Sequence, residues 1–161
     1  MNRLLGRDSM HLILVEPEIP QNTGNVARTC VMTGTRLHLV KPLGFSLSEK
    51  EVRRSGLDYW QYLDLEVHSS FDAFKQKYAA ARMLYFTTRG DGYYHQYTYK
   101  DDDFLVFGSE TRGLDQSILD QAAITLRVPM INQIPRSLNL GNTVALVLYE
   151  ALRQQGFPGM Q

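Results

Sequence analysis

Asn25 and Arg28, in the segment "NTGNVART" (Asn22 to Thr29), have side chains whose types and spacing suit the binding of a phosphate or a ribose. Residues three apart lie on the same side of a helix. A guanidinium offers a planar fork of five N–H donors and keeps its positive charge at neutral pH. Such a group can hold a phosphate or stabilise a developing alkoxide. The plain structural alternatives are a surface ion pair for Arg28 and an extended helix cap for Asn25.

Two further segments place glycine and polar residues directly after apolar runs. Gly108, in "FGSETRGL" (Phe107 to Leu114), would let backbone come close to a ligand. Glu110 would balance a positive charge on that ligand or orient Arg28; its structural alternative is a cap of the following turn. Val128 and Ile131, near Pro129, offer apolar contact and free backbone groups to a flat ring such as adenine.

The elements that must position these residues alternate between strand-like and helix-like segments. Strands are expected at residues 11–15, 36–40, 63–67, 83–87, 104–108 and 124–128, and helices over residues 23–33, 48–54, 71–80, 116–121 and within 137–156. The first helix is expected to be capped by Asn22 or Thr23 and closed by Gly34. This alternation predicts an α/β fold, a mainly parallel sheet with helices on both faces. Ligands of such sheets bind at the carboxyl ends of the strands, where the polar segments above would meet.

The last helix raises a separate question, because Val144 to Tyr149 is apolar on every side. A helix of this kind requires burial all round. Packing against the sheet and against a second subunit would supply it.

Bulk properties limit the classes of protein to consider. The 161 residues favour one domain, taken as residues 10–161 after a flexible extension over residues 1–9. No apolar run reaches about 18 residues, so neither a membrane span nor a membrane partner is expected. The single cysteine, Cys30, excludes an internal disulfide and fits a reducing, cytoplasmic location. The formal net charge is +0, which argues against non-specific nucleic-acid binding, although Arg53 and Arg54 could contribute to a local basic face.

The sequence lacks the motifs that are typical of several common enzyme chemistries. The glycine-bearing segments match neither the dinucleotide fingerprint nor a P-loop. The four histidines are scattered without metal-ligand spacing, so no metal is expected. No Gly-x-Ser-x-Gly elbow is present.

Three segments in this order resemble the signature of the SPOUT RNA methyltransferase superfamily: "NTGNVART", "FGSETRGL" and Val128 to Gln154. The resemblance runs from Met10 onward and includes no appended RNA-binding domain. It is closest to the small single-domain tRNA (cytidine/uridine-34)-2′-O-methyltransferases, which modify the wobble ribose. It implies a C-terminal deep trefoil knot over about residues 83–156, S-adenosylmethionine bound in that knot, a homodimer, and the tRNA anticodon loop as partner, with no DNA expected.

The resemblance also implies roles for individual residues. Arg28 matches the catalytic arginine, with Asn25 and Glu110 in support. The residues expected to bind S-adenosylmethionine are Phe86, Thr87, Gly108, Val128, Ile131, Ser137 and Leu138. The residues expected to contact RNA are Asn25, Arg28, Arg53, Arg54 and Tyr149. Tyr149 could equally pack in the core or against a second subunit.

The chemistry of a guanidinium favours an electrostatic role for Arg28, because a general base would first have to lose its proton. Two alternatives remain open from the sequence: methylation of another tRNA or rRNA position, and a non-catalytic RNA-binding protein on the same scaffold.

Overall fold

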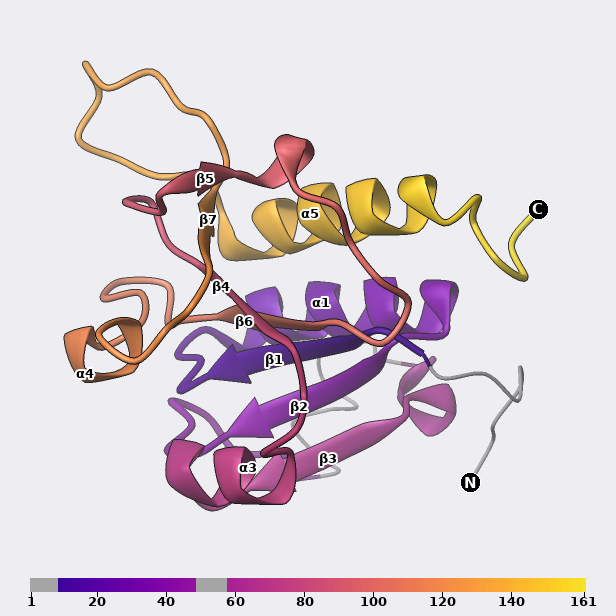
Figure 1. Cartoon of the computed structure of the whole chain (residues 1–161). Helices are drawn as coiled ribbons and strands as arrows, with labels where there is room; N and C mark the ends of the chain where they lie inside the picture. The colour runs from indigo at the N-terminus through magenta and orange to yellow at the C-terminus, as the bar shows by residue number, and fades with distance from the viewer. Residues whose placement is uncertain (1–8, 49–57) are drawn as a thin grey trace.

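Seven strands form a single sheet in the computed structural model, which describes residues 9–48 and 58–161 (Figure 1). The strands are β1 (His11–Val15), β2 (Arg36–Val40), β3 (Leu65–His68), β4 (Met83–Phe86), β5 (Gly92–Tyr93), β6 (Phe104–Phe107) and β7 (Thr125–Arg127). Their order is β3-β2-β1-β6-β4-β7-β5, and every pair is parallel. The predicted α/β fold with a parallel sheet is therefore confirmed.

The centre of the sheet is formed by strands that are distant in sequence. Leu12 of β1 is opposite Leu37 of β2 on one side and Leu105 of β6 on the other. β6 thus lies between β1 and β4, although β4 precedes it in the chain. All three leucines are fully buried.

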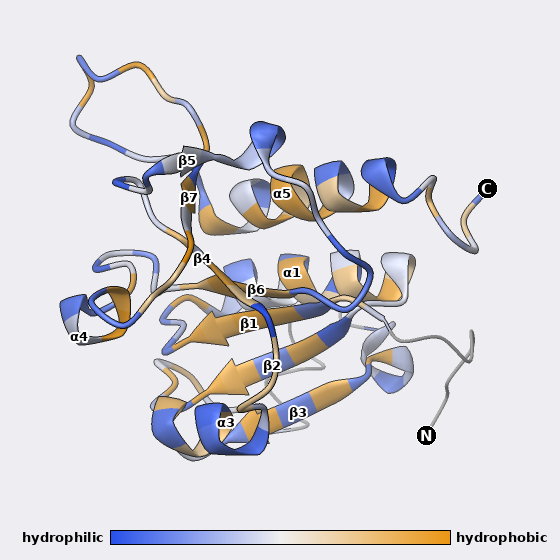
Figure 2. Cartoon of the chain, viewed as in Figure 1, coloured by the Kyte–Doolittle hydropathy of each residue, from blue (hydrophilic) through white to orange (hydrophobic). Residues whose placement is uncertain are grey.

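Helices cover both faces of the sheet, as expected. α1 (Pro20–Thr33) and α5 (Leu140–Gln154) pack together on one face, whereas α3 (Phe71–Lys77) and α4 (Gln116–Leu119) contribute to a second core on the other. Two short 3-10 helices, η1 (Trp60–Tyr62) and η2 (Tyr94–Gln96), lie in the connections. Figure 2 shows hydrophobic residues concentrated on the strands and polar residues on the outer sides of the helices.

The predicted element boundaries agree with the structure to different degrees. The first two strands have the predicted bounds, whereas the others are shorter or shifted by one or two residues and β5 was not predicted. The cap prediction for α1 is wrong: the helix begins at Pro20, and Asn22 and Thr23 are buried within its first turn. Its end is as predicted, because Gly34 adopts the left-handed conformation with φ 68°. The helix expected over residues 48–54 falls largely outside the described residues.

α5 has two different sides. Asn139 caps its start by accepting a hydrogen bond from the backbone N–H of Asn142 at 3.2 Å. Its buried residues are Gly141, Val144, Val147, Leu148, Ala151 and Leu152. Leu146 and Tyr149, by contrast, are 42% and 41% exposed. The burial on all sides that its composition predicts is therefore not achieved within one chain. Across the described part of the chain, no helix combines the length and hydropathy that a membrane span needs.

Candidate active site

A cavity of about 470 Å³ opens at the carboxyl ends of β4, β6 and β7. Six of the seven residues predicted to bind S-adenosylmethionine line it together: Phe86, Thr87, Gly108, Val128, Ser137 and Leu138. The seventh, Ile131, is 67% exposed and is not among the lining residues, whereas Met130 is. Both lie in the connection between β7 and α5, which projects from the body of the molecule (Figure 1). The cavity forms where the parallel sheet predicts a ligand site.

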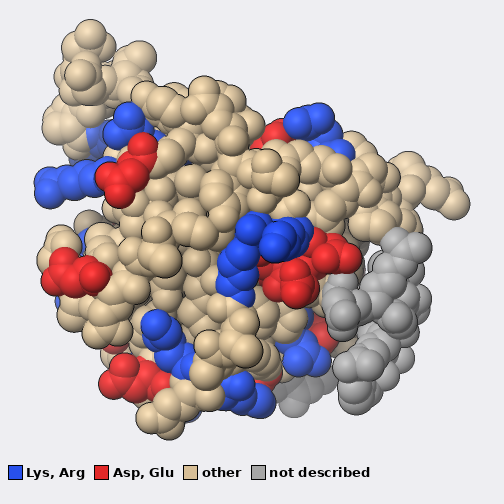
Figure 3. All heavy atoms as spheres, in the orientation of Figure 1, with Lys and Arg blue, Asp and Glu red and all other residues tan. Residues whose placement is uncertain are grey.

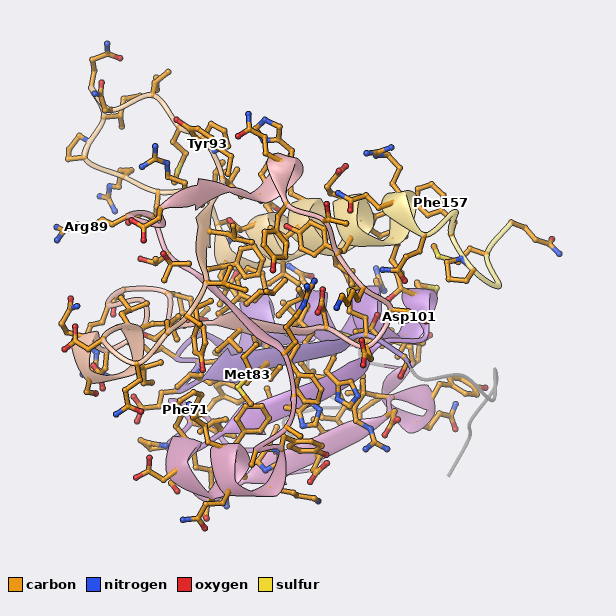
Figure 4. The ribbon with its side chains drawn as sticks, viewed as in Figure 1. Phe71, Met83, Arg89, Tyr93, Asp101 and Phe157 are labelled. Carbon is orange, nitrogen blue, oxygen red and sulfur yellow. The ribbon has the colours of Figure 1, made fainter. Side chains whose placement is uncertain are left out.

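The walls of the cavity also contain residues that sequence reasoning missed. The rings of Phe86 and Phe107 stack in parallel, 4.7 Å apart, at the ends of neighbouring strands. Three arginines line the cavity as well: Arg89, Arg112 and Arg127. Figure 4 shows Arg89 pointing away from the body of the protein. The available signal was position: Arg89 follows β4, and Arg127 is the last residue of β7.

The loop after β6 folds tightly back on itself. Ser109 and Gly113 exchange two backbone hydrogen bonds of 3.2 and 3.0 Å, and Gly113 has φ 66°. A Cβ at Gly108 would lie 2.0 Å from the carbonyl carbon of Gly113. Glycine at position 108 is therefore required by the loop's own backbone, before any ligand is considered.

Glu110 extends from this loop to the start of α1. One of its carboxylate oxygens accepts the backbone N–H of Glu18 at 2.7 Å, and the other accepts that of Ile19 at 3.0 Å. α1 has no cap from its own N-cap side chain. The first N–H groups of a helix lack partners and carry partial positive charge, so a carboxylate there is stabilising. Glu110 thus caps α1 instead of the turn that follows it, and no described contact joins it to Arg28.

Two asparagines connect Glu110 to the third motif. Asn22 donates to Glu110 at 3.4 Å, and Asn139 donates to the side-chain oxygen of Asn22 at 2.9 Å. Asn139 in turn caps α5. All three motif segments therefore meet in one hydrogen-bonded group. Asn139 belongs to the stretch from Ser137 to Asn142 that was expected to line the donor pocket, whereas Asn22 was expected only as a helix cap. The hydrogen bond between them was not predicted.

Arg28 and Asn25 are both exposed on α1, as their spacing predicts. The guanidinium carbon of Arg28 lies 4.9 Å from the centre of the Tyr59 ring. Arg28 forms no ion pair with an acidic residue in the described ranges, and it does not line the cavity of its own chain. Asn25 faces α5, where its Cβ would be 3.5 Å from a Cβ placed on Gly141. The predicted RNA contacts Arg53 and Arg54 lie outside the described residues.

Tyr149 projects from the outer side of α5. Its ring lies 6.3 Å from that of Phe157, which follows the helix and is itself 38% exposed (Figure 4). Tyr149 is therefore a surface residue of the single chain. It is available either to RNA or to a second subunit.

Three of the histidines that look scattered in the sequence form a hydrogen-bonded chain across β1, β2 and β3. Nδ1 of His11 lies 2.7 Å from Nε2 of His38, and Nδ1 of His38 lies 2.9 Å from Nε2 of His68. Burial lowers the pKa of His11 to about 4 and that of His38 to about 3. It also lowers the pKa of His68. The three rings are thus held neutral, each pair sharing one hydrogen.

Glu66 lies beside this chain, and one ligand atom each from His38, Glu66 and His68 falls within 4.8 Å of the others. The carboxylate already accepts hydrogen bonds from Lys77 and from the hydroxyl of Tyr78. Although burial raises the pKa of Glu66, these bonds lower it to about 2. The two histidines are thus hydrogen-bonded to each other and Glu66 to its neighbours on α3 and beyond, and none of the three lines the cavity.

A sequence model described as the SpoU rRNA Methylase family matches residues 9–149. The chain belongs to the SpoU methylase family. The tRNA (cytidine(34)-2′-O)-methyltransferase of Burkholderia pseudomallei (strain 1106a) is 51% identical over 152 residues, covering 92% of this chain and 97% of the relative. The protein of the same name from Escherichia coli (strain K12) is 45% identical, covering 93% and 96%. A solved structure concerning the 2-OH methylation of C/U34 on tRNA is 45% identical with a TM-score of 0.86, covering 93% of this chain and 99% of that one.

Membership of the SpoU family gives the chain the trefoil-knot fold of that family. The last turn of α5 is hydrogen-bonded to the segment between β5 and β6. The side-chain amide of Gln154, at the end of α5, donates to the carbonyl of Tyr97 at 2.8 Å and accepts the N–H of Tyr99 at 3.0 Å. This side chain pairs with the passing backbone as a neighbouring strand would, so α5 is held against the segment that leads into β6.

Proposed function

We propose that this SpoU methylase transfers a methyl group from S-adenosylmethionine to the ribose 2′-hydroxyl of nucleotide 34, cytidine or uridine, in tRNA. The observation that carries the proposal is the cavity shared by the three motif segments, in a chain that matches tRNA (cytidine(34)-2′-O)-methyltransferases over nearly their whole length.

The cavity fits a methyl donor of this kind. Its volume of about 470 Å³ lies within the range of small-molecule sites, and its lining combines apolar side chains with polar and charged ones. Phe86, Gly108, Val128 and Leu138 would hold the cofactor, together with Thr87 and Ser137 at the polar side. S-adenosylmethionine supplies an electrophilic methyl group on a sulfonium. The tight loop from Gly108 to Gly113 fixes one wall before the donor binds.

Arg28 would act on the acceptor ribose. Transfer breaks the sulfur–carbon bond, forms a bond between that carbon and the 2′-oxygen, and releases the hydroxyl proton to water. A guanidinium without an acidic partner in the described residues is free to bind the adjacent phosphate and to stabilise negative charge on the 2′-oxygen. Asn25, one turn earlier on the same side, would hydrogen-bond the same nucleotide.

We further propose that the active form is a homodimer. Arg28 does not line the cavity of its own chain, whereas a second copy could bring Arg28 of the partner subunit to it. The outer side of α5 carries exposed Leu146 and Tyr149, a pattern typical of a protein interface. Tyr149 is assigned to that interface.

A dimer would also enlarge the surface for RNA. On the face drawn in Figure 3, basic and acidic side chains lie next to one another without a dominant basic patch, in keeping with 17 basic and 17 acidic residues. Two copies would present two such surfaces to the tRNA anticodon loop. Because the proposed substrate is tRNA, the proposed location is the cytoplasm.

The test is nucleotide-resolved 2′-O-methyl mapping of tRNA after incubation with the protein and S-adenosylmethionine. We expect methylation at nucleotide 34. Arg28→Ala should lower turnover about 100- to 1000-fold, to a small residual rate, while S-adenosylmethionine still binds. The control Lys75→Ala, on the opposite face, should retain activity. Modification at another tRNA or rRNA position would replace the substrate assignment. Failure to bind S-adenosylmethionine by calorimetry would favour a non-catalytic RNA-binding protein.

A further inference from the structure

Tyr59 lies directly beneath the side chain of Arg28, and its contacts leave it little freedom. The residue is only 8% exposed. Its hydroxyl donates a 2.8 Å hydrogen bond to the carbonyl oxygen of Gly24. Gly24 is on α1, one helical turn before Arg28. The backbone carbonyl of Tyr59 also accepts the N–H of Tyr62 as η1 begins. The ring is thus fixed at its backbone and at its hydroxyl.

This fixed ring faces the guanidinium, whose carbon lies 4.9 Å from the ring centre. A cation over an aromatic face is attracted by the ring's electrons. A guanidinium has five N–H donors, so Arg28 held against the ring can still offer donors to a phosphate or ribose oxygen. Because Arg28 has no ion pair within the described residues, the ring of Tyr59 is the group that orients it.

We propose that Tyr59 is a positioning residue for the methyl transfer, holding Arg28 as an oriented cation for the acceptor nucleotide. This inference rests on the proposed function and narrows it. A side chain ordered before the substrate arrives does not have to be ordered during the reaction. A guanidinium has no free lone pair to take a proton at neutral pH, so an oriented Arg28 acts through its charge and not as a base. Burial raises the pKa of Tyr59, so its hydroxyl remains a donor to Gly24 at neutral pH.

Two substitutions separate the ring from the hydroxyl. Tyr59→Phe keeps the ring and loses the hydrogen bond to Gly24, whereas Tyr59→Leu keeps apolar volume and loses the ring. We expect Tyr59→Leu to lower kcat for tRNA methylation about 3- to 30-fold, the range that a cation–π contact supports. The Kd for S-adenosylmethionine should stay unchanged. Tyr59→Phe should retain activity within about 3-fold of the original protein.

The same pair in an Arg28→Ala background tests whether Tyr59 acts through Arg28. The residual rate should then be the same with tyrosine, phenylalanine or leucine at position 59. Equal losses from Tyr59→Phe and Tyr59→Leu, in parallel with their losses in Tm, would show a packing role and overturn the inference. A further loss from Tyr59→Leu in the Arg28→Ala background would overturn it as well.

A readout that needs no substrate separates this inference from the proposed function. The ring should shift the side-chain NMR signals of Arg28 upfield in the original protein and in Tyr59→Phe, but not in Tyr59→Leu. If the protein methylates no tRNA, the proposed function fails while the NMR result still shows whether the ring orients Arg28. If Arg28→Ala loses most of its activity and Tyr59→Leu is fully active, the result supports the proposed catalytic role of Arg28 and overturns the positioning role of Tyr59.

Discussion

Glu110 shows how one carboxylate can set the position of a helix whose preceding residue, Ile19, lies 91 residues earlier in the chain. Its two oxygens accept the backbone N–H groups of Glu18 and Ile19, the two residues directly before α1. Because α1 carries Arg28, a change at residue 110 reaches the proposed catalytic group through the helix. Glu110 is in this sense a positioning residue.

Replacing Glu110 tests this connection. Glu110→Gln removes the negative charge at the helix start, so we expect the free energy of unfolding to fall by about 1 kcal/mol. Asp101→Asn, at an exposed loop position, is the matched control and should change it by less than about 0.5 kcal/mol. Urea titration of both variants gives the comparison. Equal stability of the two would mean that the carboxylate is not a cap.

The histidine chain predicts how stability depends on pH. The pKa values of His11 and His38 fall from 6.5 to about 4 and about 3 on folding, mainly through burial. Between pH 6.5 and the lowered pKa values, these histidines bind protons in the unfolded chain but not in the folded chain. Stability is therefore fully present above pH 6.5 and is lost as the pH falls, by up to about 1.4 kcal/mol per pH unit for each histidine.

Urea unfolding between pH 7.5 and 5 measures this slope. His38→Gln removes the central proton-binding group, so its slope should be shallower than that of the original protein, whatever its absolute stability. The control is His95→Gln, because His95 lies outside the chain of three and should leave the slope intact. An unchanged slope in His38→Gln would contradict the prediction.

At this scale, the sequence predicts residues that lie beside strand ends and misses those defined by long-range partners. Phe86, Gly108 and Val128 follow apolar runs, and parallel strands bring such positions to one edge. Asn22 and Tyr59 were not predicted, because each acquires its role from a partner distant in sequence. The histidine chain was missed for the same reason: its members are neighbours only when three strands pair.

Secondary-structure elements follow the same rule: those marked by a local pattern are predicted, and those that depend on a distant partner are missed. β1 and β2 are short runs rich in leucine, isoleucine and valine that are followed by Pro17 and Pro42, so their bounds can be predicted from the sequence. β5 has two residues and exists because β7 pairs with it, which no local pattern reveals. The strand order, with β6 between β1 and β4, is likewise a property of the folded chain.

The loop after β6 offers a comparison between two of its glycines. A Cβ at Gly108 would collide with backbone at 2.0 Å, whereas one at Gly113 would meet nothing within 4 Å. Gly113→Ala should therefore lower the free energy of unfolding by only about 1 kcal/mol, the strain of a left-handed backbone conformation at a residue with a Cβ. Gly108→Ala must move the loop and should lower Tm further.

Binding of S-adenosylmethionine gives a second measurement by which Gly108→Ala and Gly113→Ala can be compared. Gly108→Ala should weaken S-adenosylmethionine binding in calorimetry at least tenfold, because the displaced loop forms a wall of the cavity. Gly113→Ala should bind within a few-fold of the original protein. If both variants lose the same Tm and affinity, the close approach at Gly108 does not shape the site.

At the scale of the whole molecule, the exposed side of α5 predicts assembly. The proposed homodimer predicts that the original protein sediments as a dimer. Leu146→Glu places a charge in the proposed interface and should sediment as a monomer. Methylation should fall with it, because the partner's Arg28 is lost. Val67→Glu, at an exposed apolar position on β3, should leave the dimer intact. A fully active monomer would refute the requirement for two copies.

The hydrogen bonds from the Gln154 side chain to the backbone of Tyr97 and Tyr99 can form only late in the synthesis of the chain. A ribosome makes the chain from residue 1 onward, so the sheet up to β6 is available long before Ser137, Leu138 and Gln154 exist. A nascent chain that has reached β7 therefore lacks part of the cavity wall and the amide that holds α5 against Tyr97 and Tyr99. If the cavity binds S-adenosylmethionine as proposed, the protein gains that site only when these last residues have been made, and an interrupted translation product would not bind the donor.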